Sequence, residues 1–225
     1  MRFLHTALLV AAKDLKSEIR SRQNLATILF FALVVLVIFH FSLGLADLQF
    51  RTVGPGLIWV AIAFAALLGL QSSFVREGER QGLSGLLLSA ADASGIYAGK
   101  ALAAWLTLLA AEAVFLPAAA ILFRADLRHA AWPLAVVLAL HSAGLAIIGT
   151  LFAAMALKVR RGHLLLPVLH FTVTIPLLMS AVKATAGVLE EGSLAGAGIW
   201  LRMGLVYDIV FFVIAAMLFE PLIQD

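Results

Sequence analysis

Three charged side chains lie deep inside apolar stretches of the sequence, where ionisable residues are rare and often functional. Glu112 falls within the segment AWLTLLAAEAVFLP, and Arg202 and Asp208 share the last apolar stretch. Arg202 and Asp208 are six positions apart, too far to pair directly on one helix unless Tyr207 or a neighbouring helix bridges them. Two interpretations fit equally well: a buried structural network that closes a helix bundle, or a polar pathway through it.

The histidines are the residues that could hold a metal ion or a haem iron. His40, His141 and His170 lie within three different apolar stretches, and the other three lie at the ends of such stretches: His5, His129 and His163. No two of the buried three have the i, i+4 spacing of a helix-borne metal site. We therefore expect these three side chains to hydrogen-bond between helices, and we expect no metal site.

The segment GIYAGKA (95–101) has some features of a phosphate-binding loop. However, it has three residues between its glycines where four are needed, and Ala101 occupies the position of the Ser or Thr that holds magnesium. We therefore expect that the chain binds no ATP by itself.

The composition is that of an integral membrane protein. Of the 225 residues, 63% are hydrophobic and 13% are charged, whereas soluble domains carry about 25% charge. We expect one membrane domain spanning residues 1–225, with no appended soluble catalytic domain. The net charge of +3 is explained by basic residues on one membrane face, and it does not indicate nucleic-acid binding. The absence of cysteine excludes disulfides and thiolate metal sites on this chain.

Six apolar stretches are each long enough to cross the hydrocarbon core of a bilayer as a helix. They are residues 25–45, 53–75, 98–123, 132–157, 164–182 and 198–219. Gly54-Pro55-Gly56 predicts a turn that starts the second helix, and Pro167 and Pro176 predict a bend in the fifth. The fold class is therefore all-α, with six transmembrane helices.

Residues 1–22 are expected to form an amphipathic helix that precedes the first span. One face of this helix is apolar, and its residues recur at three- and four-residue spacing: Leu4, Leu8, Ala11, Leu15 and Ile19. A helix of this type lies in the membrane interface with its apolar face toward the lipid chains.

Lysine and arginine are distributed unequally between the two sides of the predicted bundle. If the amino terminus is cytoplasmic, the inner segments hold eleven of these residues and the outer segments four, with Arg202 near the start of the last helix. This asymmetry predicts a multi-pass protein with both termini in the cytoplasm, and it places the segment 76–97 on the same side.

The segment 76–97, between the second and third spans, carries an apolar cluster inside a polar connection. Such a cluster must be buried against something. We expect a short cytoplasmic helix with Leu83, Leu86 and Leu87 on one face, docked on a cytoplasmic protein; the alternative is a helix on the membrane surface with these leucines in lipid. The predicted partner-binding residues are Glu77, Glu79, Gly82, Leu83, Leu86, Leu87 and Lys100.

This arrangement of charged residues, a glycine, a leucine cluster and a later Gly-Lys resembles the coupling segment of type-2 ABC transporter permeases. Three stretches are more specifically similar to the haem exporter protein B family of cytochrome c maturation: GPGLIWVA (54–61), the block 161–176 and the tail 207–220. The resemblance extends over essentially the whole chain. The chain departs from the family pattern where prolines are expected, at Ala90-Ala91 and near Thr172.

The resemblance implies a permease subunit in the bacterial inner membrane that serves c-type cytochrome biogenesis and is not itself an enzyme. A separate cytoplasmic ATPase subunit would bind ATP and dock on the coupling segment. Other implied partners are a haem-handling membrane subunit with a tryptophan-rich motif and, through the complex, a periplasmic haem chaperone. ATP hydrolysis would drive haem export or release of the haem-loaded chaperone. The complex would handle haem, but the four tryptophans of this chain are dispersed, so we expect no cofactor bound directly to it.

Three other functions remain open at the level of sequence. The chain could be a type-2 ABC permease for a lipid, a drug or a polysaccharide. It could also be a membrane-embedded enzyme that uses Glu112 and Asp208 as acid–base groups, or a structural scaffold subunit.

Overall fold

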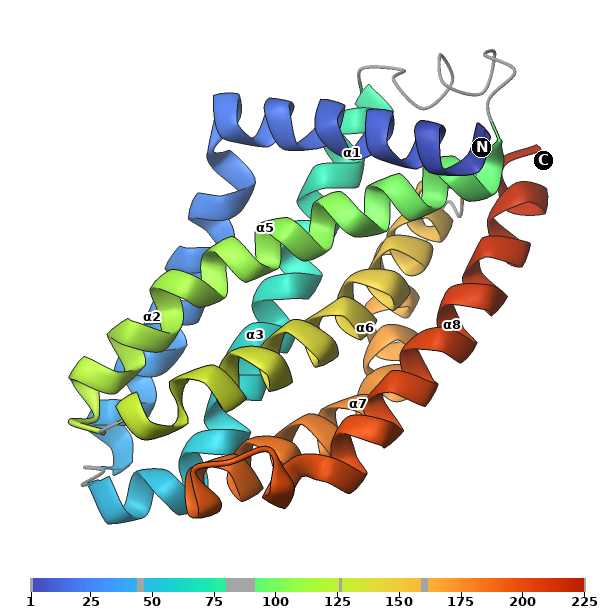
Figure 1. Ribbon diagram of the computed structural model, residues 1–225. Helices are drawn as coiled ribbons and strands as arrows, with labels where there is room; N and C mark the ends of the chain where they lie inside the picture. The colour runs from blue at the N-terminus through green and yellow to red at the C-terminus, as the bar shows by residue number, and fades with distance from the viewer. Residues whose placement is uncertain (1, 44–46, 80–91, 126, 159–161, 225) are drawn as a thin grey trace.

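The computed structural model describes residues 2–43, 47–79, 92–125, 127–158 and 162–224. These residues form helices joined by short connections and contain no strand. The helices, labelled as in Figure 1, are α1 (Arg2–Ser21), α2 (Gln23–Leu43), α3 (Asp47–Glu79), α5 (Ala93–Leu122), α6 (Ala131–Lys158), α7 (Gly162–Glu191) and α8 (Gly198–Gln224). Two short 3₁₀ helices, η1 (Arg128–Ala130) and η2 (Ala195–Ala197), precede α6 and α8.

Six of the described helices, α2, α3 and α5 to α8, are long and apolar enough to cross a membrane. They run alternately up and down, so that both termini lie at the same end of the bundle (Figure 1). At this end α1 lies across the bundle, α3 finishes and α5 begins. The prediction of an all-helical protein with six spans is confirmed.

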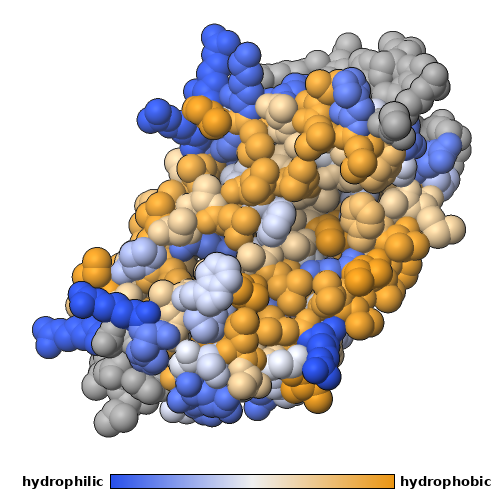
Figure 2. Space-filling view, in the orientation of Figure 1, coloured by the Kyte–Doolittle hydropathy of each residue, from blue (hydrophilic) through white to orange (hydrophobic). Residues whose placement is uncertain are grey.

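α6 lies in the middle of the bundle and packs against α3, α5, α7 and α8. Its buried face includes Leu134, Val137, Leu145 and Ile148. α8 instead exposes a continuous apolar surface made of Ile199, Val206, Ile209, Val213 and Met217. On the face shown in Figure 2, apolar residues cover most of the middle of the molecule, and strongly hydrophilic residues gather mainly at its two ends. This distribution suits a bundle whose sides contact lipid chains.

The predicted turn at Gly54-Pro55-Gly56 is wrong, because all three residues lie inside α3. Gly54 has a packing role: a β carbon there would come within 2.8 Å of the Phe50 ring. The Phe50 ring stacks on Phe123 at 5.0 Å between centroids, which joins the start of α3 to the end of α5. A small residue at position 54 therefore makes room for an aromatic contact, and the helix continues through the proline.

The fifth predicted span also differs from its sequence-based bounds. α7 is continuous from Gly162 to Glu191 and holds both Pro167 and Pro176 in its interior. Neighbouring membrane helices and hydroxyl side chains commonly satisfy the backbone groups that an internal proline frees. Two threonines of α7 also bond the helix backbone: the Thr174 hydroxyl donates to the His170 carbonyl at 2.9 Å, and the Thr172 hydroxyl donates to the Val168 carbonyl at 2.9 Å. The carbonyls that Pro167 and Pro176 free belong to residues 163 and 172, so these bonds do not replace the lost ones.

Candidate functional site

The segment GIYAGKA (95–101), considered above as a phosphate loop, is helical throughout and forms the first turns of α5. Its two glycines contact α1. A β carbon on Gly99 would lie 2.5 Å from the Ala7 carbonyl oxygen and 2.7 Å from Val10 Cβ, and one on Gly95 would lie 3.1 Å from the Phe3 carbonyl oxygen. Glycines four residues apart let two helix backbones approach closely. The segment therefore holds α1 against α5.

The apolar face predicted for α1 is only partly buried in the bundle. Ala11 is buried, as are Ala7 and Val10 beside it, whereas Leu4, Leu8 and Ile19 are exposed. Small residues of α1 thus pack on α5, and its large aliphatic residues point away from the bundle. That these exposed residues lie in the membrane interface remains a prediction.

Lys100 is the one predicted coupling residue whose side chain the structure describes. It is buried, and its Nζ lies 3.4 Å from Asp14 Oδ2 on α1. Asp14 also pairs with Lys13 at 2.9 Å. Lys100 therefore joins α5 to α1 within the chain. Glu77 and Glu79 belong to the last turn of α3, but their side chains lie outside the described residues, as does the group Gly82, Leu83, Leu86 and Leu87. Their partner-binding role stays a prediction.

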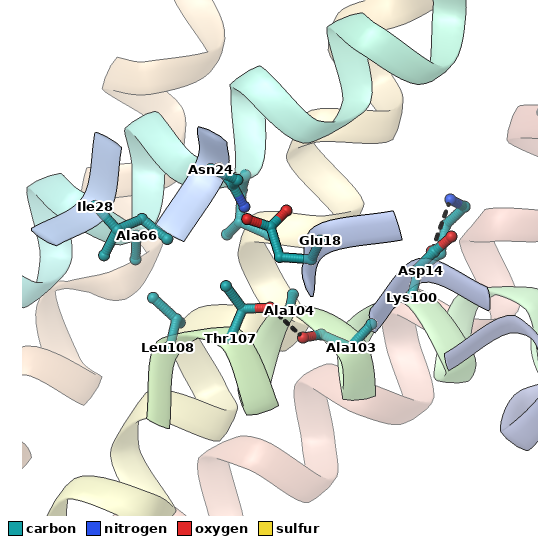
Figure 3. A pocket seen from close by; sticks show the side chains of 11 residues that line it. Asp14, Glu18, Asn24, Ile28, Ala66, Lys100, Ala103, Ala104, Thr107 and Leu108 are labelled. Atoms are coloured by element: carbon teal, nitrogen blue, oxygen red, sulfur yellow. Dashed lines mark hydrogen bonds and ion pairs between the residues drawn. The ribbon is translucent and has the colours of Figure 1, made fainter. Parts of the chain in front are cut away.

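A polar pocket of about 40 Å³ lies beside this ion pair, between α1, α2, α3 and α5 (Figure 3). Asp14 and Glu18 line it from α1, Asn24 from α2, and Lys100 and Thr107 from α5. The space is large enough for a few water molecules. One Glu18 carboxylate oxygen accepts the Leu25 backbone N–H at 2.8 Å, which fixes the start of α2 relative to α1. Two carboxylates and one amine therefore connect the helices at the end where α3 leaves and α5 enters the bundle.

The three intramembrane charged residues do not form one network. Glu112 and Asp208 are buried, whereas Arg202 is exposed on α8. Tyr207 does not bridge Arg202 and Asp208, because its hydroxyl donates to the Val173 carbonyl of α7 at 2.7 Å. The sequence-based suggestion of an Arg202–Tyr207–Asp208 bridge is therefore wrong.

The two buried carboxyl groups approach α6 from different helices. The Ser142 hydroxyl of α6 approaches Glu112 of α5, and the Asp208 carboxyl of α8 packs directly over Gly144 of α6. Within the described residues, no partner lies in hydrogen-bonding geometry with the carboxylate oxygens of either residue. Both acids are therefore buried among the spanning helices, where ionisable side chains are rare and often functional.

His141 confirms the prediction of hydrogen bonding between helices. Its Nε2 lies 3.1 Å from the Ser180 hydroxyl of α7, and Ser180 in turn donates to the Trp200 carbonyl of α8 at 2.7 Å. The His141 ring also meets the edge of Trp59, whose Nε1–H donates to Thr185 at 2.8 Å. This network connects α3, α6, α7 and α8, and its pairings could not be predicted from the sequence.

His170 does not make the predicted interhelical hydrogen bond. It is fully buried, and within the described residues neither ring nitrogen has a hydrogen-bond partner. The rings of Phe152 and Phe171 meet it edge-on at 5.9 and 5.8 Å between centroids, so its surroundings offer aromatic contact instead of a polar partner. His40 packs similarly, against Phe41 and Phe123. The described residues contain no cluster of three potential metal ligands.

One known protein family matches this chain over most of its length. The family model described as CcmB protein matches residues 5–220. The chain belongs to the CcmB family. The match extends from α1 into α8 and therefore includes the α1–α5 contact, both buried acids and the His141 network. It confirms the family resemblance derived from the motifs.

Several curated relatives support this assignment. The chain is 29% identical to heme exporter protein B of Pseudomonas aeruginosa over 210 residues, which cover 92% of this chain and 94% of the relative. It is 31% identical to heme exporter protein B of Bradyrhizobium diazoefficiens over 177 residues, 79% of each chain. For the protein of the same name from Rhodobacter capsulatus, the identity is 29% over 168 residues, 75% of this chain and 77% of the relative.

Proposed function

We propose that this CcmB-family chain is the membrane permease subunit of an ABC-type complex in c-type cytochrome biogenesis. The observation that carries this proposal is the match to the CcmB family over residues 5–220, together with curated relatives named heme exporter protein B. In this role the chain hydrolyses no ATP itself. It couples hydrolysis on a separate cytoplasmic ATPase subunit to haem export, or to release of a haem-loaded periplasmic chaperone.

The architecture supports docking of an ATPase at one end of the bundle. With six spans, both termini, α1, the end of α3 and the start of α5 share the same end. The excess of lysine and arginine in the segments at this end favours the cytoplasmic side of the bacterial inner membrane. The ATPase would dock on the segment 76–97, and the haem-handling membrane subunit with its tryptophan-rich motif would contact the spans.

The contacts of Lys100 and Gly99 support transmission of movement from that docking site. A displacement of the segment that enters α5 acts on α5 directly, and the buried Lys100–Asp14 pair and the close contact of Gly99 with Ala7 carry it to α1. Closely packed interfaces favour discrete arrangements over continuous deformation. α1 and α5 would therefore move as one unit when the ATPase changes conformation.

Gene deletion in a bacterium that makes c-type cytochromes tests the proposed function. We expect the deletion strain to lack haem-stained c-type cytochromes, and expression of the wild-type chain should restore them. Accumulation of haem-loaded periplasmic chaperone in the deletion strain would indicate the release role, and a chaperone without haem would indicate haem export. A deletion strain with normal c-type cytochromes would contradict the proposal and would favour a permease for another substrate.

A further inference from the structure

A hollow of about 390 Å³ lies on the side of the bundle, between the last turns of α5 and the start of α6. Among the lining residues that the structure describes, Arg128 is the one polar side chain. The apolar walls include Leu116, Pro117 and Ile121 of α5, Leu127 of the connection and Ala131 of α6. The connection from α5 to α6 lies at the end of the molecule opposite both termini (Figure 1).

The residues around the hollow mark a boundary between lipid and water. Ile121 and Trp132 are 79% and 74% exposed, which is unfavourable for large apolar side chains in water but suits contact with lipid. Arg124 and Arg128 are exposed in the adjoining connection. A tryptophan and two arginines beside an exposed isoleucine are typical of the depth at which lipid headgroups meet acyl chains. The hollow therefore opens at a depth where it can contact both the headgroup and an acyl chain of one lipid molecule.

We propose that this hollow binds one phospholipid of the outer leaflet, with an acyl chain along Leu116, Ile121 and Leu127 and the phosphate at Arg128. An acyl chain requires only apolar contact, and a phosphate requires a cation at one end of that contact. An extended peptide would need partners for its backbone N–H and C=O groups, and the single polar side chain among the described lining residues cannot supply them. A porphyrin is disfavoured because the lining residues that the structure describes include no aromatic ring and no iron ligand.

Native mass spectrometry of the purified full-length chain tests this site with palmitoyl-oleoyl phosphatidylglycerol as the probe. We expect the wild-type chain to retain one phosphatidylglycerol, and to retain the matching diacylglycerol, which lacks the phosphate, at least about tenfold more weakly. Ala131→Trp fills the hollow and should abolish retention, whereas Ala26→Trp, at an exposed alanine near the other end of the bundle, should not. Arg128→Gln should weaken retention about tenfold, and Arg124→Gln, outside the lining, should have little effect.

Equal retention by wild type and Ala131→Trp would overturn the proposal. So would an equal loss in Arg124→Gln and Arg128→Gln, which would indicate adsorption of lipid to surface charge.

A second measurement uses the unmodified chain and so does not depend on the folding of a variant. Phosphatidylglycerol with a photoreactive group on its acyl chain is added to the protein in phosphatidylcholine vesicles, and the labelled peptides are mapped. Labelling concentrated on residues 116–131 supports the site. Uniform labelling of the exposed faces of α2 and α8 would overturn it. Protection of residues 116–131 in the assembled complex by a partner chain would also overturn it, because the occupant would then be a protein.

Discussion

Lys100 Nζ lies 3.4 Å from Asp14 Oδ2, and the lysine side chain is buried at the contact between α5 and α1. Lys100 follows Gly99, where a β carbon would lie 2.5 Å from the Ala7 carbonyl oxygen of α1. Charge pairing and close packing thus act on the same contact, at the end of the bundle where the proposed ATPase docks.

Loss of the lysine charge should loosen α1. In Lys100→Met, Asp14 keeps Lys13 at the surface but loses its buried partner, so we expect a loss of about 1–3 kcal/mol in the free energy that holds α1 in place. Hydrogen–deuterium exchange of residues 2–21 measures this loss. The matched control is Lys13→Met, which removes an ion pair whose lysine side chain is 48% exposed. This substitution should have little effect on the protection of α1. Unchanged protection of α1 in Lys100→Met would contradict this account.

Gly99 and Gly56 offer a matched pair of glycine-to-alanine substitutions inside helices. In Gly99→Ala the new β carbon would lie 2.5 Å from the Ala7 carbonyl oxygen, whereas at Gly56 it meets nothing within 4 Å. We expect Gly99→Ala to destabilise the protein by about 1–3 kcal/mol through overpacking. Gly56→Ala should be neutral, or stabilising by up to about 1 kcal/mol. Thermal unfolding in detergent compares the two, and similar melting temperatures would argue against the α1–α5 contact.

Replacement by leucine should affect stability differently at the two fully buried histidines, His141 and His170. His141→Leu breaks the hydrogen bond to Ser180 and should cost about 1 kcal/mol, the scale of interhelical hydrogen bonds in membranes. His170→Leu removes a buried imidazole that has no partner among the described residues, so it should not lower the melting temperature. Cytochrome c assembly should survive both substitutions. If His170→Leu abolished assembly at a normal protein level, His170 would act in function and not in packing.

The orientation predicts the outcome of reporter fusions at Ser89, within the segment 76–97. The eleven-to-four distribution of lysine and arginine places this position in the cytoplasm. A fused reporter that works only in the cytoplasm should therefore be active, and one that needs export should be inactive. Activity of the exported reporter at Ser89 would reverse the orientation and remove the argument for a cytoplasmic partner.

Sequence reasoning succeeded for features that depend on length and hydropathy. The six spans follow from apolar stretches long enough to cross a bilayer, and the helix at residues 2–21 follows from its periodicity. It failed for features that depend on which surfaces meet. Gly54 looked like part of a turn because only the structure shows the Phe50 ring beside it. The close contact of Gly95 and Gly99 with α1 could not be predicted, because α1 is distant from them in sequence.

The buried polar residues show the same limit. That Glu112, Asp208 and His170 lie among helices could be inferred from the apolar stretches around them. Their neighbours could not, because these depend on how each helix is rotated about its axis. Arg202 shares a helix with Asp208 yet is exposed, and Asp208 fits against α6 because residue 144 is a glycine.

The central claim is that this chain is the membrane subunit that holds a separate ATPase through the segment 76–97. Leu87 lies in that segment, outside the described residues. Burial of its side chain in a groove on the ATPase would contribute roughly 1.5–3 kcal/mol, which a charged residue would forfeit. Leu87→Met preserves an apolar side chain of similar size and serves as the matched control.

Co-purification of the ATPase in mild detergent tests this claim most directly. The wild-type chain and Leu87→Met should each retain an ABC ATPase subunit in a fixed ratio. Leu87→Glu should insert into the membrane at a normal level, lose the ATPase and fail to support cytochrome c maturation. If Leu87→Glu retained the ATPase in the wild-type ratio, or if the wild-type chain retained none, the account would be contradicted.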